Sequence, residues 1–159
     1  MSDSDPAAIP HFGRKAQGPT YTDRPGSYAV IRNPKGRLAV VHVQTIDGFY
    51  LPGGGADPGE SSEATLVREV REECGLTVRI VRAVGRAVQY VITASGQHVA
   101  KQCVYYEAAV VPGGECAATE ADHVLCWMRR EEALSVFVLE ADAWAIQQVM
   151  PDDRAGEFN

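Results

Sequence analysis

The sequence predicts an α/β fold of the α+β type, in which a mixed β-sheet lies between helices. The chain has 159 residues, of which 45% are hydrophobic, and this is the size and composition of one globular domain. Short runs rich in Val, Ile and Tyr are separated by turns of hairpin length, which indicates strands. Helical periodicity appears in the middle of the chain and again near its C-terminus, which indicates helices packed against a sheet.

The chain is expected to form one domain between two tails. Residues 1–25 hold four of the nine prolines and show no periodic apolar pattern, which predicts a flexible or loosely docked N-terminal tail. The periodic pattern starts at Gly26, so the domain is expected over residues 26–150. Residues 151–159 then form a C-terminal tail.

The first expected elements are two strands that form a hairpin. Residues 27–33 (SYAVIRN) and 37–44 (RLAVVHVQ) are typical of strands, and Pro34-Lys35-Gly36 is the turn between them. A short apolar piece over residues 49–51 then runs into Pro52-Gly53-Gly54-Gly55, which indicates a sharp break.

One clear amphipathic helix follows, over residues 61–74. Ser61 or Ser62 can cap its start, and Gly75 is placed to end it. At 100° per residue its apolar side chains fall on one face and its carboxylates on another. The apolar face holds Val67, Val70 and Cys74, and the acidic face holds Glu69, Glu72 and Glu73.

The second half of the chain is expected to contain three strands and a final helix. Residues 76–93 and 98–111 are rich in Val, Ile and Tyr, and a short turn joins them. A glycine-bearing loop, a strand and a helical segment follow, over residues 112–122, 123–129 and 131–150.

Charge and composition exclude several classes of function. The net charge is −6 and the sequence contains no basic stripe, which argues against nonspecific binding of nucleic acid. No apolar run approaches the roughly 18 residues of a membrane span, and the N-terminus lacks the pattern of a secretory signal, so we expect a cytoplasmic protein. The four cysteines and four histidines are scattered, without the spacing of a zinc site.

The acidic face of the helix has two interpretations. Glu69 lies three and four residues before Glu72 and Glu73, and such like-charge pairs each cost about 0.2–0.5 kcal/mol. Carboxylates in the last turns of a helix also oppose its dipole. An oxygen-rich cluster that is kept at this cost suits a hard divalent ion such as magnesium or manganese. The alternative is an ordinary solvated acidic face, and the helix alone does not decide between the two.

The residues before the helix favour the metal site. Five residues separate Gly54 from Glu60, and seven more lead to the run 68–76, REVREECGL. This pattern resembles the complete Nudix box, G-x5-E-x7-R-E-U-x-E-E-x-G-U, in which U is aliphatic. The resemblance covers about residues 26–150 and implies the Nudix-type α/β/α sandwich. Every specified position is matched, by Gly54, Glu60, Arg68, Glu69, Val70, Glu72, Glu73, Gly75 and Leu76.

The resemblance implies a MutT-like pyrophosphohydrolase. Such an enzyme uses Mg²⁺ or Mn²⁺ and cleaves a diphosphate linkage in a nucleoside diphosphate derivative or nucleoside triphosphate, by attack of water on phosphorus. The metal offsets the phosphate charge, and a nearby carboxylate takes the proton of the water.

The resemblance also implies roles for the residues of the box. Glu72 and Glu73 are expected metal ligands, commonly with Glu69 and with a backbone carbonyl at Gly53. Glu69 has two possible roles, as a ligand or as the catalytic base, and Glu73 also counts among the catalytic candidates.

Four further residues of the box have supporting roles. Arg68 is expected to orient the carboxylates by bidentate pairing. Glu60 holds the loop and helix together, and Gly75 ends the helix. Gly54 is expected to let the main chain approach the substrate and its ion.

Outside the box, the candidates are less specific. Glu120 lies in the glycine-bearing loop, where the family often places a carboxylate that acts as base, and Asp122 competes for this role. Glu107 is either a site residue or a solvent-facing strand residue. Tyr90 can stack on a base or pack on the sheet, and Arg86 can bind phosphate or be an ordinary exposed strand residue.

Two other functions remain open: a Nudix-fold module that binds a nucleotide without turnover, and an RNA-end hydrolase. The intact box argues against the first and the acidic charge against the second. The sequence lacks the proline after the box that ADP-ribose enzymes carry and the upstream motif of the coenzyme A group. We therefore expect a small nucleotide substrate; a homodimer is possible.

Overall fold

The structure is a computed structural model that describes residues 8–152. Parts of both expected tails, residues 1–7 and 153–159, lie outside the described residues. The described strands are β1 (His11–Phe12), β2 (Thr22–Ile31), β3 (Leu38–Val43), β4 (Gly48–Tyr50), β5 (Gly53–Gly55), β6 (Val78–Ile92), β7 (His98–Val110) and β8 (His123–Met128). The described helices are α1 (Ser62–Cys74), α2 (Arg130–Val136) and α3 (Glu140–Val149).

The strands form two sheets. The larger sheet has the order β1-β6-β7-β2-β5 and is mixed. β1 runs parallel to β6 and β2 runs parallel to β7, whereas β6 runs antiparallel to β7 and β5 antiparallel to β2. The smaller sheet, β4-β3-β8, is antiparallel. The predicted mixed sheet is therefore confirmed. The expected hairpin of residues 27–33 and 37–44 is wrong, because β2 and β3 lie in different sheets and only one isolated bridge, Arg32 with Leu38, joins them.

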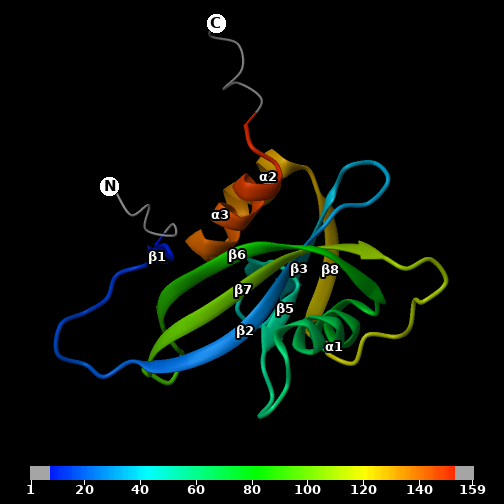
Figure 1. The fold of residues 1–159 in the computed structure, drawn as a ribbon. Helices are drawn as coiled ribbons and strands as arrows, with labels where there is room; N and C mark the ends of the chain where they lie inside the picture. The colour runs from blue at the N-terminus through cyan, green and yellow to red at the C-terminus, as the bar shows by residue number, and fades with distance from the viewer. Residues whose placement is uncertain (1–7, 153–159) are drawn as a thin grey trace, which may run out of the picture.

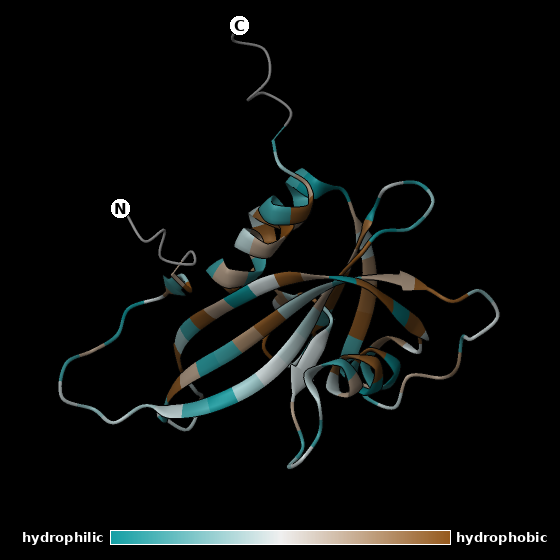
Figure 2. Ribbon diagram, viewed as in Figure 1, coloured by the Kyte–Doolittle hydropathy of each residue, from teal (hydrophilic) through white to brown (hydrophobic). Residues whose placement is uncertain are grey.

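Helices cover both faces of the larger sheet, which confirms the expected α/β/α layering (Figure 1). One core packs α1 against the sheet through Leu66, Val70 and Ile31. The other core holds α3 and the smaller sheet, with Tyr105 and Ile146 fully buried. Hydrophobic and hydrophilic bands alternate along β6 and β7 (Figure 2), as expected for strands with two different faces.

The first segment that differs from expectation is the N-terminal one. β2 begins at Thr22, and His11 pairs in parallel with Val88 of β6. β2 tolerates Pro25 in its interior. The neighbouring strand β5 pairs with β2 only from Gly26 onward, so the N–H that Pro25 lacks is not needed for a hydrogen bond to β5. A two-residue strand and an exposed polar strand end have no apolar periodicity, which is why the sequence pattern missed both.

The final helical segment also differs, because it divides into α2 and α3. Residues 137–139 leave the helical path, and the Val138 N–H donates to the Phe49 carbonyl at 3.1 Å. The run Val136-Phe137-Val138 is β-branched and aromatic, which favours this extended pairing over a helix.

The ends of α1 agree with the sequence prediction. The Ser61 hydroxyl accepts from the Ala64 N–H at 3.1 Å, and Gly75 adopts φ 68° as it ends the helix. This left-handed conformation favours glycine, and a Cβ there would also clash with the Cys116 carbonyl. α1 is thereby fixed at both ends beside the sheet.

None of the helices within residues 8–152 is long and apolar enough to cross a membrane.

Candidate active site

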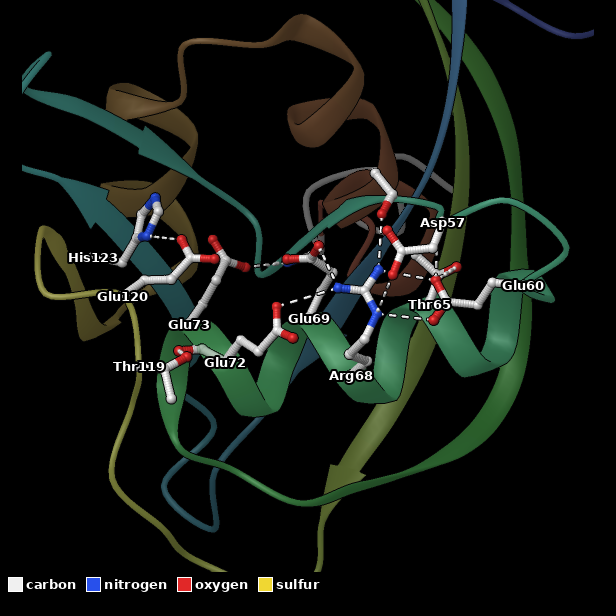
Figure 3. Close-up of polar contacts among 12 residues, drawn as sticks. Asp57, Glu60, Thr65, Arg68, Glu69, Glu72, Glu73, Thr119, Glu120 and His123 are labelled. Carbon is white, nitrogen blue, oxygen red and sulfur yellow. Dashed lines mark hydrogen bonds and ion pairs between the residues drawn. The ribbon is translucent and has the colours of Figure 1, made fainter.

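The acidic face of α1 meets β5 and the loop before β8 (Figure 3). Glu69, Glu72 and Glu73 come from the helix, and Glu120 comes from the loop. Glu69, Glu72 and Glu120 offer carboxylate oxygens that all lie within 4.8 Å of one another. The structure thus brings together the acidic residues of the box and the loop carboxylate predicted from sequence.

The loop is held to the end of α1 by its backbone. The N–H groups of Thr119 and Glu120 donate to the Glu72 carbonyl at 2.9 and 3.3 Å. Carbonyls in the last turn of a helix have no partner within the helix, so they are free to accept these bonds. Glu120 is therefore placed beside the cluster by the same turn that carries Glu72 and Glu73.

Arg68 is the cation that organises this cluster. Its Nε and Nη2 donate to the two oxygens of Glu60 at 2.8 and 2.9 Å, a bidentate pair. Its Nη1 donates to Glu69 at 3.0 Å and to Glu72 at 3.2 Å. These bonds raise the pKa of Arg68, so one permanently charged side chain orients three carboxylates.

Glu60 joins the loop that precedes α1 to the helix. It accepts from the Thr65 hydroxyl at 2.6 Å and from the Asp57 N–H at 3.1 Å, in addition to Arg68. The hydrogen bonds from Arg68 and Thr65 lower the pKa of Glu60 to about 2. All of these contacts are structural, which is the role expected for Glu60 from sequence.

Glu73 is the most buried carboxylate of the cluster, with 8% of the residue exposed. The Gly53 N–H donates to its Oε1 at 2.7 Å. Burial raises the pKa of Glu73 to about 8, because the hydrogen bond from Gly53 only partly offsets desolvation. Burial also raises the pKa of Glu69. A nearby divalent cation is the natural counter-charge for such a group.

The glycines of β5 let its backbone approach both β2 and the cluster. Gly53 has φ 145°, and a Cβ on it would clash with the Ser27 carbonyl of β2. A Cβ on Gly54 would lie 2.5–2.9 Å from the carboxylate atoms of Glu69. Any side chain at position 54 would therefore displace Glu69.

A cavity of about 500 Å³ opens beside the cluster. Its acidic end is formed by Glu73, Gly53 and Gly54, and two cationic side chains, Arg24 and Lys101, also line it. Apolar and aromatic side chains complete its wall, namely Tyr28, Val43, Ile46, Tyr50 and Leu51. A wall that combines charged, aromatic and apolar side chains suits a ligand with both phosphates and a flat base.

Four sequence candidates from outside the box do not line this cavity: Arg86, Tyr90, Glu107 and Asp122. Glu107 forms ion pairs with Arg32 at 2.6 Å and Arg82 at 2.8 Å. Burial acts to raise its pKa, but these two hydrogen bonds outweigh that effect and hold it below its usual value. Arg86 lines a different cavity beside Trp144.

Tyr90 and Asp122 have other partners. The Tyr90 hydroxyl lies 2.7 Å from His11 Nδ1, and its ring packs edge-on against Tyr21. Asp122, the alternative to Glu120, accepts from the Thr45 hydroxyl at 3.1 Å. Of these two loop acids, Glu120 is the one in the cluster.

Sequence reasoning missed the apolar and aromatic wall of the cavity and also three basic side chains that line it: Arg24, Lys101 and His123. Arg24 and Lys101 become neighbours through the parallel register of β2 and β7, which spans distant segments and has no local sequence signal. His123 had one signal, its position three residues after Glu120 at the start of a strand. Its Nδ1 forms an ion pair with Glu120.

The donor set fits a divalent cation. Glu69, Glu72 and Glu120 form an all-oxygen group, the type that hard ions such as Mg²⁺ and Mn²⁺ prefer. Glu73, Glu120 and His123 form a second group, which shares Glu120 with the first.

Comparisons with known proteins agree with this fold and site. The family model of the NUDIX domain matches residues 22–152. A protein of Bacillus subtilis (strain 168) with the provisional name 8-oxo-dGTP diphosphatase is 33% identical over 60 residues, which is 38% of this chain and 40% of that protein. The chain thus matches less than half the length of this curated relative.

Solved structures show the same fold. A NUDIX hydrolase from Nitrosomonas europaea superposes with a TM-score of 0.63 at 20% identity, covering 80% of this chain and 88% of that one. A MutT NUDIX hydrolase from Burkholderia pseudomallei gives a TM-score of 0.60 at 25% identity, covering 80% and 98%. The fold is therefore that of the Nudix hydrolases. With the family match over residues 22–152, the chain belongs to the NUDIX domain family, as the box indicated.

Proposed function

We propose that this chain is a divalent-metal-dependent pyrophosphohydrolase of small nucleotides. Its substrate would be a nucleoside triphosphate or a nucleoside diphosphate derivative. The observation that carries the proposal is the cluster of Glu69, Glu72, Glu73 and Glu120, of which Glu73 lines a cavity. The same cavity is lined by two cationic side chains, Arg24 and Lys101, and by aromatic residues.

The carboxylates would hold the cation. Glu72 and Glu73 are the proposed ligands from α1, and Mg²⁺ is the proposed ion. Glu120 from the loop lies with Glu69 and Glu72 in one candidate group and with Glu73 and His123 in the other. The chemistry that such an ion supplies is neutralisation of phosphate charge and a lower pKa for a bound water. Arg68 holds Glu69 and Glu72 in fixed orientations, so little reorganisation is needed when substrate enters.

The cavity would orient the substrate with its phosphates toward the cluster. Arg24 and Lys101 are placed to bind phosphate oxygens, and Lys101 Nζ lies 5.2 Å from the ring centroid of Tyr28. Tyr50 and Ile46 supply the apolar wall for a base. Hydrolysis then forms one P–O bond to water and breaks the P–O bond of the phosphoanhydride.

Glu69 or Glu120, whichever of the two is not a metal ligand, would take the proton of the attacking water. Glu69 has one oxygen bonded to Arg68, and burial raises its pKa, which makes it a stronger base. Glu120 accepts no hydrogen bond from Arg68 in the described structure and contacts His123. Glu69→Gln and Glu120→Gln variants distinguish them, because the base variant loses kcat and keeps its Mg²⁺ affinity, whereas a ligand variant loses that affinity.

A turnover screen tests the proposal. Purified protein is incubated with Mg²⁺ and a panel of nucleoside triphosphates, including 8-oxo-dGTP, and of nucleotide sugars, dinucleoside polyphosphates and ADP-ribose. Products are resolved by chromatography. We expect cleavage of a phosphoanhydride in at least one nucleotide, and loss of that activity in a Glu72→Gln/Glu73→Gln variant. No cleavage, together with a nucleotide-induced rise in Tm, would instead support a binding module without turnover.

A further inference from the structure

His123 is the one imidazole of the described residues that lies at the carboxylate cluster, and neither the box nor the proposed reaction uses it. It begins β8, where it pairs with Val43, and its side chain lines the same cavity as Glu73. Only 18% of this side chain is exposed. The nitrogens of a largely buried imidazole need hydrogen-bond or metal partners.

The ring nitrogen Nδ1 is buried and has no partner in good hydrogen-bond geometry among the described residues. Its nearest polar neighbour is Glu120 Oε2, with which it forms an ion pair, and Asp122 lies at 3.7 Å. Figure 3 shows the imidazole and the Glu120 carboxylate facing each other at the Glu73 end of the cluster. Glu73, Glu120 and His123 each offer one ligand atom within 4.8 Å of the others.

We propose that Glu73, Glu120 and His123 form a cation subsite that selects a borderline transition-metal ion over Mg²⁺. This inference rests on the proposed function, since it divides the same cluster into two subsites. Imidazole nitrogen prefers ions such as Co²⁺, Ni²⁺ and Zn²⁺, whereas an all-oxygen group such as Glu69, Glu72 and Glu120 suits Mg²⁺. Glu120 belongs to both groups, so one loop carboxylate links the two subsites.

Binding of Co²⁺ tests the subsite, because its visible absorption reports imidazole coordination without any turnover. Untagged, metal-free protein is titrated with Co²⁺ and, separately, with Mg²⁺ by calorimetry. The variants are His123→Asn and His123→Gln. The matched control is His98→Asn, since His98 lies on β7 and packs against Tyr21, away from the cavity.

We expect both His123 variants to bind Co²⁺ at least about tenfold more weakly than wild type, since even the loss of an outer partner of a metal ligand costs about 10- to 100-fold. Their Mg²⁺ affinity is expected to stay within about twofold, which also shows that the variants are folded. His98→Asn is expected to match wild type for both ions.

Three results would overturn the subsite: Co²⁺ affinity that does not depend on His123, an equal loss of Co²⁺ and Mg²⁺ affinity in both variants, or no Co²⁺ binding by wild type. An equal loss would mean that His123 only orients Glu120. Turnover with Mg²⁺, measured on the same preparations, tests the proposed function separately. If the wild type is inactive but binds Co²⁺ in a way that depends on His123, the proposed subsite is supported and the proposed hydrolase function is refuted.

Discussion

Replacing Asp142 by alanine should destabilise the fold and loosen the active-site loop together. Asp142 lies on α3 with 0% exposure, and it accepts from the Leu51 N–H at 3.0 Å and from the Tyr105 hydroxyl at 2.8 Å. Leu51 lies two residues before Gly53, whose N–H holds Glu73. Asp142 therefore anchors the segment that leads into the cluster.

The size of the effect follows from the two partners. Alanine at position 142 leaves the Leu51 N–H and the Tyr105 hydroxyl buried without an acceptor, and each orphaned group costs about 1–3 kcal/mol. The expected loss in the free energy of unfolding is therefore about 2–6 kcal/mol. Burial raises the pKa of Asp142 to about 6, because desolvation makes the charged carboxylate less favourable than it would be in water.

Asp142→Asn is the matched control. Its amide oxygen still accepts from the Leu51 N–H, and its amide nitrogen donates to the Tyr105 hydroxyl, which accepts as well as donates. No charge is buried in this variant. We expect asparagine to cost less than half as much as alanine.

Urea unfolding at pH 7, followed by tryptophan fluorescence, measures both variants. Mg²⁺ affinity by calorimetry gives the second readout, and we expect it to fall in the alanine variant and to be kept in the asparagine variant. Equal destabilisation by both substitutions, or a loss below about 1 kcal/mol for alanine, would refute the role of this hydrogen-bond network.

Three further predictions concern the cluster and the sheet surface. Arg68→Lys loses the bidentate pair with Glu60, so thermal unfolding should show a lower Tm than wild type, and an unchanged Tm would contradict this. Gly54→Ala places a Cβ against Glu69, so calorimetry should show weaker Mg²⁺ binding, and wild-type affinity would refute the steric argument. Glu107 has a lowered pKa in the folded state, so its contribution to stability is present above the unfolded pKa of about 4.3 and is lost as pH falls through the folded pKa. Glu107→Gln should therefore lose less stability than wild type between pH 6 and pH 3 in urea unfolding, and identical losses would exclude this linkage.

The features predicted correctly from the sequence are those that short local patterns determine. The start and end of α1 follow from Ser61 and Gly75, because caps act within a few residues of the helix end. The convergence of Glu69, Glu72 and Glu73 follows from helical spacing alone. These features needed no knowledge of long-range pairing.

The missed features depend on contacts between distant segments. Arg24 meets Lys101 only through the register of two parallel strands, and His11 joins the sheet through a strand of two residues. The break between α2 and α3 depends on the contact of Val138 with Phe49. In each case the contacting residue lies far away in the sequence, so neither hydrophobic periodicity nor a helix cap predicts the contact.

The central claim is that the carboxylate cluster binds the cation on which hydrolysis depends. The most direct test removes divalent metal from the enzyme with a chelator, and then restores Mg²⁺ while nucleotide cleavage is measured. Glu73→Gln is the test variant, and Glu107→Gln is the matched control, because Glu107 lies with Arg32 and Arg82 outside the cavity. We expect Mg²⁺ to restore cleavage in wild type and in Glu107→Gln, and to leave Glu73→Gln inactive. Cleavage that persists without divalent metal, or full activity of Glu73→Gln, would contradict the claim.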